Sequence, residues 1–99
     1  MTKKDFSKYI EKGNSIIDFW AEWCGPCKIM EPHFKKAAEK HKNIKFGKVN
    51  VDSEYDLSSE FQVMSIPTTI FFKDGEIVER NVGAMSESAI GRKIQEAFS

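Results

Sequence analysis

Hydrophobic positions recur along the chain with two spacings, one typical of helices and the other of strands. Between residues 2 and 13 they lie three or four positions apart, after a Thr2-x-x-Asp5 pattern typical of a helix start and before Gly13, which ends the helix. Residues 15–21 form a nearly continuous apolar run, typical of a strand buried on both faces of a parallel sheet. After residue 27 the apolar spacing predicts a long amphipathic helix.

The second half of the chain alternates in the same way. Residues 45–51 predict a strand, residues 52–62 a short helix and residues 68–72 another strand. Asp74-Gly75 joins this strand to an extended run over residues 76–82, a combination that predicts a hairpin. A last amphipathic helix begins at about Ser86. The predicted α/β fold joins a βαβ unit to a ββα unit in one mixed sheet, with helices on both faces.

Length and composition indicate one domain over residues 1–99. The chain has 99 residues, of which 40% are hydrophobic and 30% charged, a globular mix that is too apolar for a disordered tail. No apolar run approaches the roughly 18 residues of a membrane span. The N-terminal lysines are not followed by the apolar core of a signal peptide, so we expect a cytoplasmic protein with no membrane association.

The charges balance over the whole chain but not within its halves. Fifteen basic and fifteen acidic residues give a formal net charge of zero, which argues against a nucleic-acid partner. Residues 1–50 hold 11 basic and 6 acidic side chains (+5), and residues 51–99 hold 4 and 9 (−5). Because the halves of a small domain interleave, we expect this asymmetry to be spread over solvated faces. The alternative is a weak dipole that orients docking.

The only two cysteines stand in the sequence Cys24-Gly25-Pro26-Cys27, between a predicted strand and a predicted helix. A bridge across so short a loop removes little entropy from the unfolded chain, so a structural disulfide is a poor explanation. The N–H groups and the dipole at the start of a helix favour a thiolate at Cys24. Pro26 suits the first helical turn, where its missing N–H would be unpaired. Cys27, one turn further in, is expected to be more buried and close enough to form a disulfide with Cys24.

Two other interpretations of the cysteines remain open, inert packing and half of a zinc site. Zinc takes about four ligands, and only His33 and His41 are candidates to complete the set. His33 lies about 240° round an ideal helix from Cys27, so the two side chains point apart. We therefore expect redox chemistry and no metal.

Other candidate residues have ordinary explanations when taken alone. Asp18 interrupts the apolar strand, where desolvation would raise its pKa, although it is also compatible with a strand-edge aspartate facing water. Lys48 is compatible with a solvated strand lysine, and Trp20 and Trp23 with core aromatics. For Pro67, as for any X–Pro bond, the cis form has a prior of about 5–6%.

The stretch from Asp18 to Lys28, DFWAEWCGPCK, resembles the active site of the thioredoxin family. Further matches follow in order over nearly the whole chain from about Phe6: Pro32, Lys48, Asp52, Ile66-Pro67-Thr68, Asp74-Gly75 and Val82-Gly83-Ala84. The resemblance implies the thioredoxin fold, but the helix start at Thr2 leaves no residues for the family's first strand, so we expect four strands. Glu31 and Ser65 also depart from the pattern, since the family often has a small residue and a glycine there.

The resemblance implies a thiol–disulfide oxidoreductase that reduces protein disulfides. Cys24 would attack as a thiolate and Cys27 would resolve the mixed disulfide, while Asp18 would exchange protons with Cys27 and Lys48 would modulate Asp18. Pro67 would be cis, and the Ile66 backbone would pair with an extended target segment. An apolar docking surface around the nucleophile is implied, made of Trp20, Trp23, Gly25, Pro26, Ile66, Pro67, Val82, Gly83 and Ala84.

The implied partners are target proteins that contain disulfides and a thioredoxin reductase that supplies electrons. No bound cofactor is implied beyond the redox-active disulfide Cys24–Cys27, and the protein would be a monomer that takes part in electron transport. The Gly-Pro between the cysteines resembles reducing members of the family, which favours a reductase over an isomerase. A binding module whose redox activity is incidental remains the alternative from another functional class.

Overall fold

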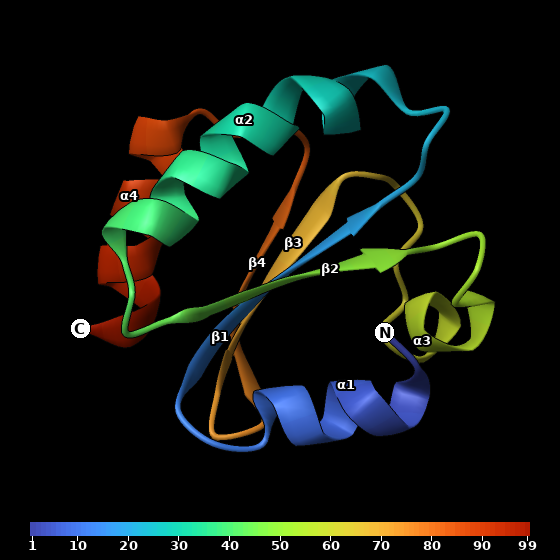
Figure 1. Cartoon of the computed structure of the whole chain (residues 1–99), viewed down its shortest axis with the longest axis horizontal. Coiled ribbons are helices and arrows are strands. Elements are labelled where there is room, and N and C mark those ends of the chain that lie inside the picture. The colour runs from blue at the N-terminus through green and yellow to red at the C-terminus, as the bar shows by residue number, and fades with distance from the viewer.

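The computed structural model describes all 99 residues and contains the eight elements that the hydrophobic pattern predicts (Figure 1). In chain order they are α1 (Lys3–Ile10), β1 (Asn14–Trp20), α2 (Gly25–Lys40), β2 (Lys45–Asn50), α3 (Tyr55–Glu60), β3 (Thr68–Lys73), β4 (Glu76–Val82) and α4 (Glu87–Phe98). None of these helices combines the length and the apolarity that crossing a membrane requires.

The strands form one four-stranded sheet in the order β2-β1-β3-β4. β1 runs parallel to β2 and antiparallel to β3, and β3 and β4 form an antiparallel hairpin. The mixed four-stranded sheet confirms the predicted fold class. The hairpin turns at Asp74 and Gly75, which have φ angles of 51° and 86°. Two positive φ angles in succession suit a tight hairpin turn, which explains the Asp-Gly pair.

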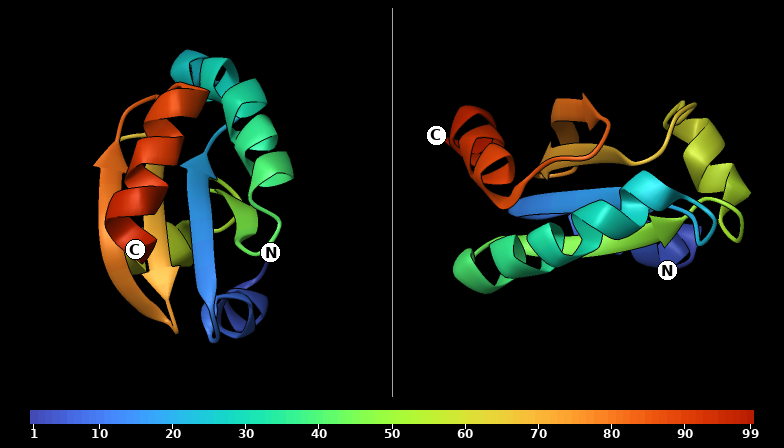
Figure 2. Two further views of the ribbon diagram at one scale, coloured as in Figure 1. Left: turned by 90° about the vertical axis from the view of Figure 1, so that its left-hand side faces the viewer. Right: turned by 90° about the horizontal axis from the view of Figure 1, so that it is seen from above.

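Side chains of β1 alternate between two hydrophobic cores, one on each face of the sheet. Ile16 belongs to the core formed with α2 and α4, which lie side by side (Figure 2). Ile17 and Phe19 belong to the core on the other face, which includes residues of α1 and α3. Burial on both faces explains why this strand is apolar at nearly every position. Asp18 has the same parity as Ile16 and therefore lies on the α2 and α4 side.

Local hydrogen bonds determine where the helices begin. The Thr2 hydroxyl accepts from the Asp5 N–H at 3.2 Å, and the Ser86 hydroxyl accepts from the Ala89 N–H at 3.2 Å, so both predicted helix starts are N-caps. The predicted helix over residues 52–62 is shorter in the structure. The first residues of the predicted range form a turn, which is held by the Asn50 side chain: its Oδ1 accepts from the Asp52 N–H at 2.9 Å.

The expectation that the two halves of the chain interleave holds for the helices, since α2 packs beside α4 and α1 shares a core with α3, but not for the strands. Strand order places β2 and β1, from the basic half, together at one side, and β3 and β4, from the acidic half, together at the other (Figure 2). The reason is topological, because β3 joins the free side of β1 and its hairpin partner extends the sheet outward. The halves meet through ion pairs such as the one between Lys3 Nζ and Glu60 Oε1, at 2.9 Å.

Candidate active site

The two cysteines lie where β1 ends and α2 begins. Cys24 is the N-cap of α2, and its Sγ accepts from the Cys27 N–H at 3.2 Å. The two residues form a disulfide with their Cα atoms 5.3 Å apart, an ordinary distance for such a bridge. Gly25 and Pro26 form the first turn of the helix, so the proline costs no hydrogen bond.

Burial distinguishes the two cysteines less than the sequence suggested. Cys24 is 4% exposed and Cys27 is 2% exposed in this disulfide form. What separates them is position, since only Cys24 lies ahead of the helix N–H groups. Those donors and the helix dipole favour a thiolate at Cys24 once the disulfide is reduced.

A second loop, which leads into the neighbouring strand β3, approaches the disulfide. The Ile66–Pro67 peptide bond is cis, and the Ile66 carbonyl oxygen lies 3.7 Å from Cys24 Sγ. The Gly83 N–H donates to the Pro67 carbonyl at 2.8 Å, and Val82 pairs with Thr68 in the β3–β4 register. The loop around Pro67 therefore reaches the cysteines through Ile66 and the end of β4 through Gly83.

The exposure of the residues predicted for the docking surface varies widely. Trp23 is 70% exposed and Val82 is 61% exposed, whereas Pro67 is buried and Ile66 is half-buried. Gly25, Pro26 and Ala84 are exposed, and Trp20 and Gly83 are half-buried. Trp20 packs against the small cluster of Ala21, Cys24 and Cys27.

Sequence reasoning missed what holds the exposed indole of Trp23. Trp23 Nε1–H donates to Asp52 Oδ2 at 2.9 Å, across 29 positions of sequence. Asp52 follows β2 and thus ends beside the residue that follows β1, because parallel neighbours finish at the same edge of the sheet. In the sequence alone, Asp52 is only one of the matches to the family pattern. The side of α2 also carries an exposed apolar residue that the sequence analysis did not select, Ile29, at 67%.

Asp18 is buried in the middle of β1, at 1% exposure, and its Oδ1 has no hydrogen-bond partner. A strand-edge aspartate facing water is therefore excluded. Burial raises the pKa of Asp18 from 3.8 to about 7, while the Lys48 ammonium lowers this pKa and the Glu31 carboxylate raises it. A carboxyl with such a pKa exchanges a proton near neutral pH, as general acid–base chemistry requires.

Lys48 lies opposite Asp18 in the parallel β1–β2 register, but its hydrogen bond goes elsewhere. Lys48 Nζ donates to Glu31 Oε2 at 2.6 Å and lies 4.2 Å from the centroid of the Trp20 ring. With Glu22, Cys27 and Lys28 these side chains line a pocket of about 330 Å³ beside the disulfide. Sequence reasoning found Lys48 but not its partner, because residues 31 and 48 lie on different elements.

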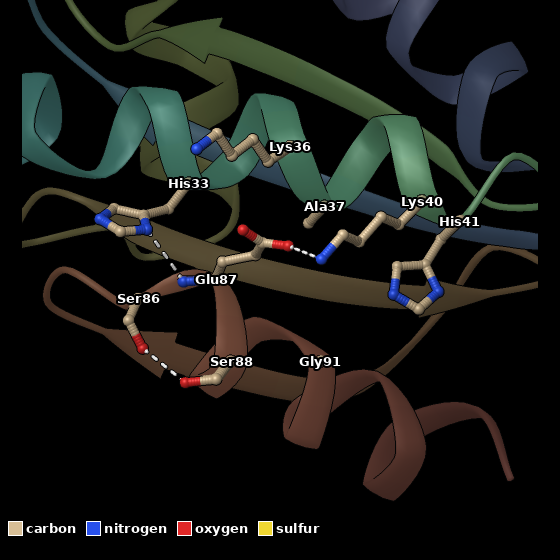
Figure 3. Close-up of a pocket in the computed structure, with 9 residues that line it drawn as sticks. All are labelled: His33, Lys36, Ala37, Lys40, His41, Ser86, Glu87, Ser88 and Gly91. Atoms are coloured by element: carbon tan, nitrogen blue, oxygen red, sulfur yellow. Dashed lines mark hydrogen bonds and ion pairs between the residues drawn. The ribbon is translucent and has the colours of Figure 1, made fainter.

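The two histidines considered as zinc ligands lie in a different place. His33 and His41 line a pocket of about 590 Å³ between α2 and α4 (Figure 3). His33 Nδ1 accepts from the Glu87 N–H at 3.1 Å and thereby caps an otherwise unpaired amide at the start of α4. No group of three or more His, Cys, Asp or Glu residues in the structure could hold a metal ion.

Comparison with known proteins identifies a family that matches most of the chain. The family model described as Thioredoxin matches residues 1–96. A thioredoxin of Mycoplasma pneumoniae is 47% identical over 75 residues, which cover 76% of this chain and 74% of the relative. A thioredoxin of Coprinus comatus is 40% identical over 98 residues, covering 96% of this chain and 92% of the relative.

Solved structures give the same result. The oxidized form of mitochondrial thioredoxin 3 from Saccharomyces cerevisiae is 33% identical, with a TM-score of 0.89 over 96% of this chain and 90% of its own. Plasmodium falciparum thioredoxin is 30% identical, with a TM-score of 0.91 over 99% of this chain and 95% of its own.

Proposed function

The chain belongs to the thioredoxin family of thiol–disulfide oxidoreductases, and from that premise we propose that it reduces disulfides in other proteins. Its redox group is the Cys24–Cys27 pair, and the family needs no bound cofactor. The observation that carries the proposal is the position of Cys24, the N-cap residue of a 16-residue helix with a second cysteine three positions later.

The reaction begins with Cys24. Its thiolate attacks one sulfur of a target disulfide, forms a mixed disulfide, and releases the other target sulfur as a thiolate. Cys27 then loses its proton and attacks Cys24 Sγ, so that the target's remaining sulfur leaves as a thiolate. The target gains two electrons, and the protein is left with the Cys24–Cys27 disulfide. A thioredoxin reductase supplies two electrons to restore the dithiol.

Asp18 is the proton acceptor for Cys27 in this proposal. It is a buried carboxyl on the strand that leads into the active site, and its raised pKa suits proton transfer near neutral pH. Lys48 modulates Asp18 through its positive charge, which lowers the pKa of the carboxyl. Neither residue is placed to contact a target, since Asp18 is 1% exposed and Lys48 is bound to Glu31.

The target docks on the exposed rim around Cys24. Trp23, beside Cys24 in the chain, and Val82, opposite Thr68 at the end of β4, offer exposed apolar surface, and the Ile66 backbone offers hydrogen bonds to an extended target segment. Gly25, Pro26, cis Pro67, Gly83 and Ala84 complete this docking surface, with Trp20 beneath it. The protein acts as a single-domain monomer in the cytoplasm, in the electron-transport chain that runs from the reductase to its targets. A further similarity is compatible with this role, because a solved structure 33% identical to the chain concerns the thiol resolving mechanism of a yeast mitochondrial peroxiredoxin via glutathione and thioredoxin systems.

The test is turnover of a protein disulfide by dithiothreitol, with and without this protein, followed by single cysteine variants. Cys24→Ser should abolish the acceleration. Cys27→Ser should keep the first attack and accumulate covalent mixed disulfides, which non-reducing electrophoresis detects. No acceleration by the wild-type protein contradicts the proposed function. Trapping by the Cys24 variant but not by the Cys27 variant reverses the assigned roles.

A further inference from the structure

Lys48, the charged residue of β2 that lies opposite Asp18, forms an ion pair with Glu31 of α2. Lys48 Nζ lies 2.6 Å from Glu31 Oε2, and the Lys48 and Glu31 side chains are 31% and 59% exposed. The ammonium also lies over the Trp20 ring, 4.2 Å from its centroid. Lys48 and Cys27 line the same pocket, and the ion pair of Lys48 is with Glu31 rather than with the Asp18 carboxylate.

The charges around Asp18 come from few elements. β2 contributes Lys48 and α2 contributes Glu31, and these are the two charges that act on the carboxyl. β3 places Thr69 opposite Asp18, and this residue carries no charge. Glu22 and Lys28 line the same pocket but do not perturb the carboxyl. Glu31 is therefore the group that offsets Lys48.

We propose that Glu31 is a positioning residue for the resolving step: it pairs with Lys48 over Trp20 and keeps an uncompensated ammonium from acting on Asp18. The proposal rests on the proposed function, because it concerns the proton that Asp18 takes from Cys27. In that step the Cys27 thiol gives its proton to the Asp18 carboxylate and its sulfur attacks Cys24 Sγ. The target sulfur leaves with the electron pair of the broken bond.

Loss of the Glu31 charge changes the strength of Asp18 as a base. The Glu31 carboxylate raises the pKa of Asp18 and the Lys48 ammonium lowers it, so Glu31→Gln removes the first effect and leaves the second unopposed. The acceptor then ionises at lower pH and becomes a weaker base for the Cys27 proton. Because Glu31 is exposed at the surface of α2, the substitution leaves no cavity in the core.

The experiment measures Asp18 directly and the resolving step separately. Carbon-13 NMR of the side-chain carboxyl gives the pKa of Asp18 in oxidised and reduced protein. Rapid mixing of reduced protein with a chromogenic aryl disulfide gives two releases of coloured thiolate, the first from attack by Cys24 and the second from resolution by Cys27. Glu39→Gln is the matched control, since it removes the same charge from an exposed position two turns along the same helix.

In Glu31→Gln the pKa of Asp18 should fall by roughly half a pH unit. The acid limb of the second release should move to lower pH by the same amount, with the first release unchanged. Lys48→Met should move the pKa of Asp18 upward, and Glu39→Gln should move neither measurement. An unchanged pKa of Asp18 in Glu31→Gln overturns the proposal, as does a shifted pKa with an unmoved pH profile of the second release. A wild-type protein that never gives the second release overturns the proposed function itself, whatever the titration yields.

Discussion

Removing the buried carboxyl of Asp18 should stabilise the fold, and more so as the pH rises. Burial raises the pKa of Asp18 from 3.8 to about 7, so between these values the unfolded chain is ionised while the folded protein still holds the proton. The cost to folding therefore grows from about pH 4 to about pH 7 and is constant above that. A rise of about three pH units is equivalent to about 4 kcal/mol of lost stability.

Asp18→Asn isolates this effect, because the amide has the same shape and does not titrate in this range. Any cost of burying the amide is the same at every pH, so the difference in unfolding free energy between variant and wild type should change by about 4 kcal/mol between about pH 4 and about pH 8 in the variant's favour. Urea unfolding of the oxidised proteins at several pH values gives this difference. Glu39→Gln, an exposed carboxyl, is the control. A difference that is flat with pH, or that slopes the other way, refutes the reasoning.

Three further outcomes are expected. Asp18→Ala should lower kcat for a protein disulfide more than it changes KM, and turnover unaltered from about pH 6 to about pH 8 speaks against proton transfer by this residue. Asp52→Ala removes the acceptor that holds the Trp23 indole and should raise KM by about two- to tenfold, so an equal KM in steady-state assays means that the indole needs no anchor. Phe6→Ala should destabilise the protein by about 3–5 kcal/mol in urea unfolding, because this ring is 1% exposed and packs against three other aromatic rings. A loss of unfolding free energy below about 1 kcal/mol contradicts that packing.

The elements of the fold were predictable because their signals are local. Thr2 and Ser86 cap their helices through bonds that span three residues, and Asp74-Gly75 fixes its hairpin through its own backbone angles. The start of α3 was predicted too early, because the turn that delays it depends on the Asn50 side chain. The hydrophobic pattern does not indicate which backbone groups the Asn50 side chain binds.

The site was predictable where chain neighbours make it and unpredictable where distant elements meet. Cys24 and Cys27 are three residues apart, so helix geometry alone brings them together. The partners of Trp23 and Lys48 lie 29 and 17 positions away and depend on how β2 and α2 are placed against β1. Asp52 and Glu31 carry no local signal that would assign them these contacts.

The two edge strands of the sheet carry opposite net charge, although the formal net charge of the chain is zero: β2 holds Lys45 and Lys48, and β4 holds Glu76, Glu79 and Arg80. The molecule extends 31 × 29 × 19 Å, while the Debye length at physiological ionic strength is about 8 Å. A partner approaching the β2 edge is therefore screened from the β4 edge and experiences a local excess of one sign. We therefore expect its association rate to depend on ionic strength although the chain is neutral overall, and its orientation on approach to depend on which edge it meets.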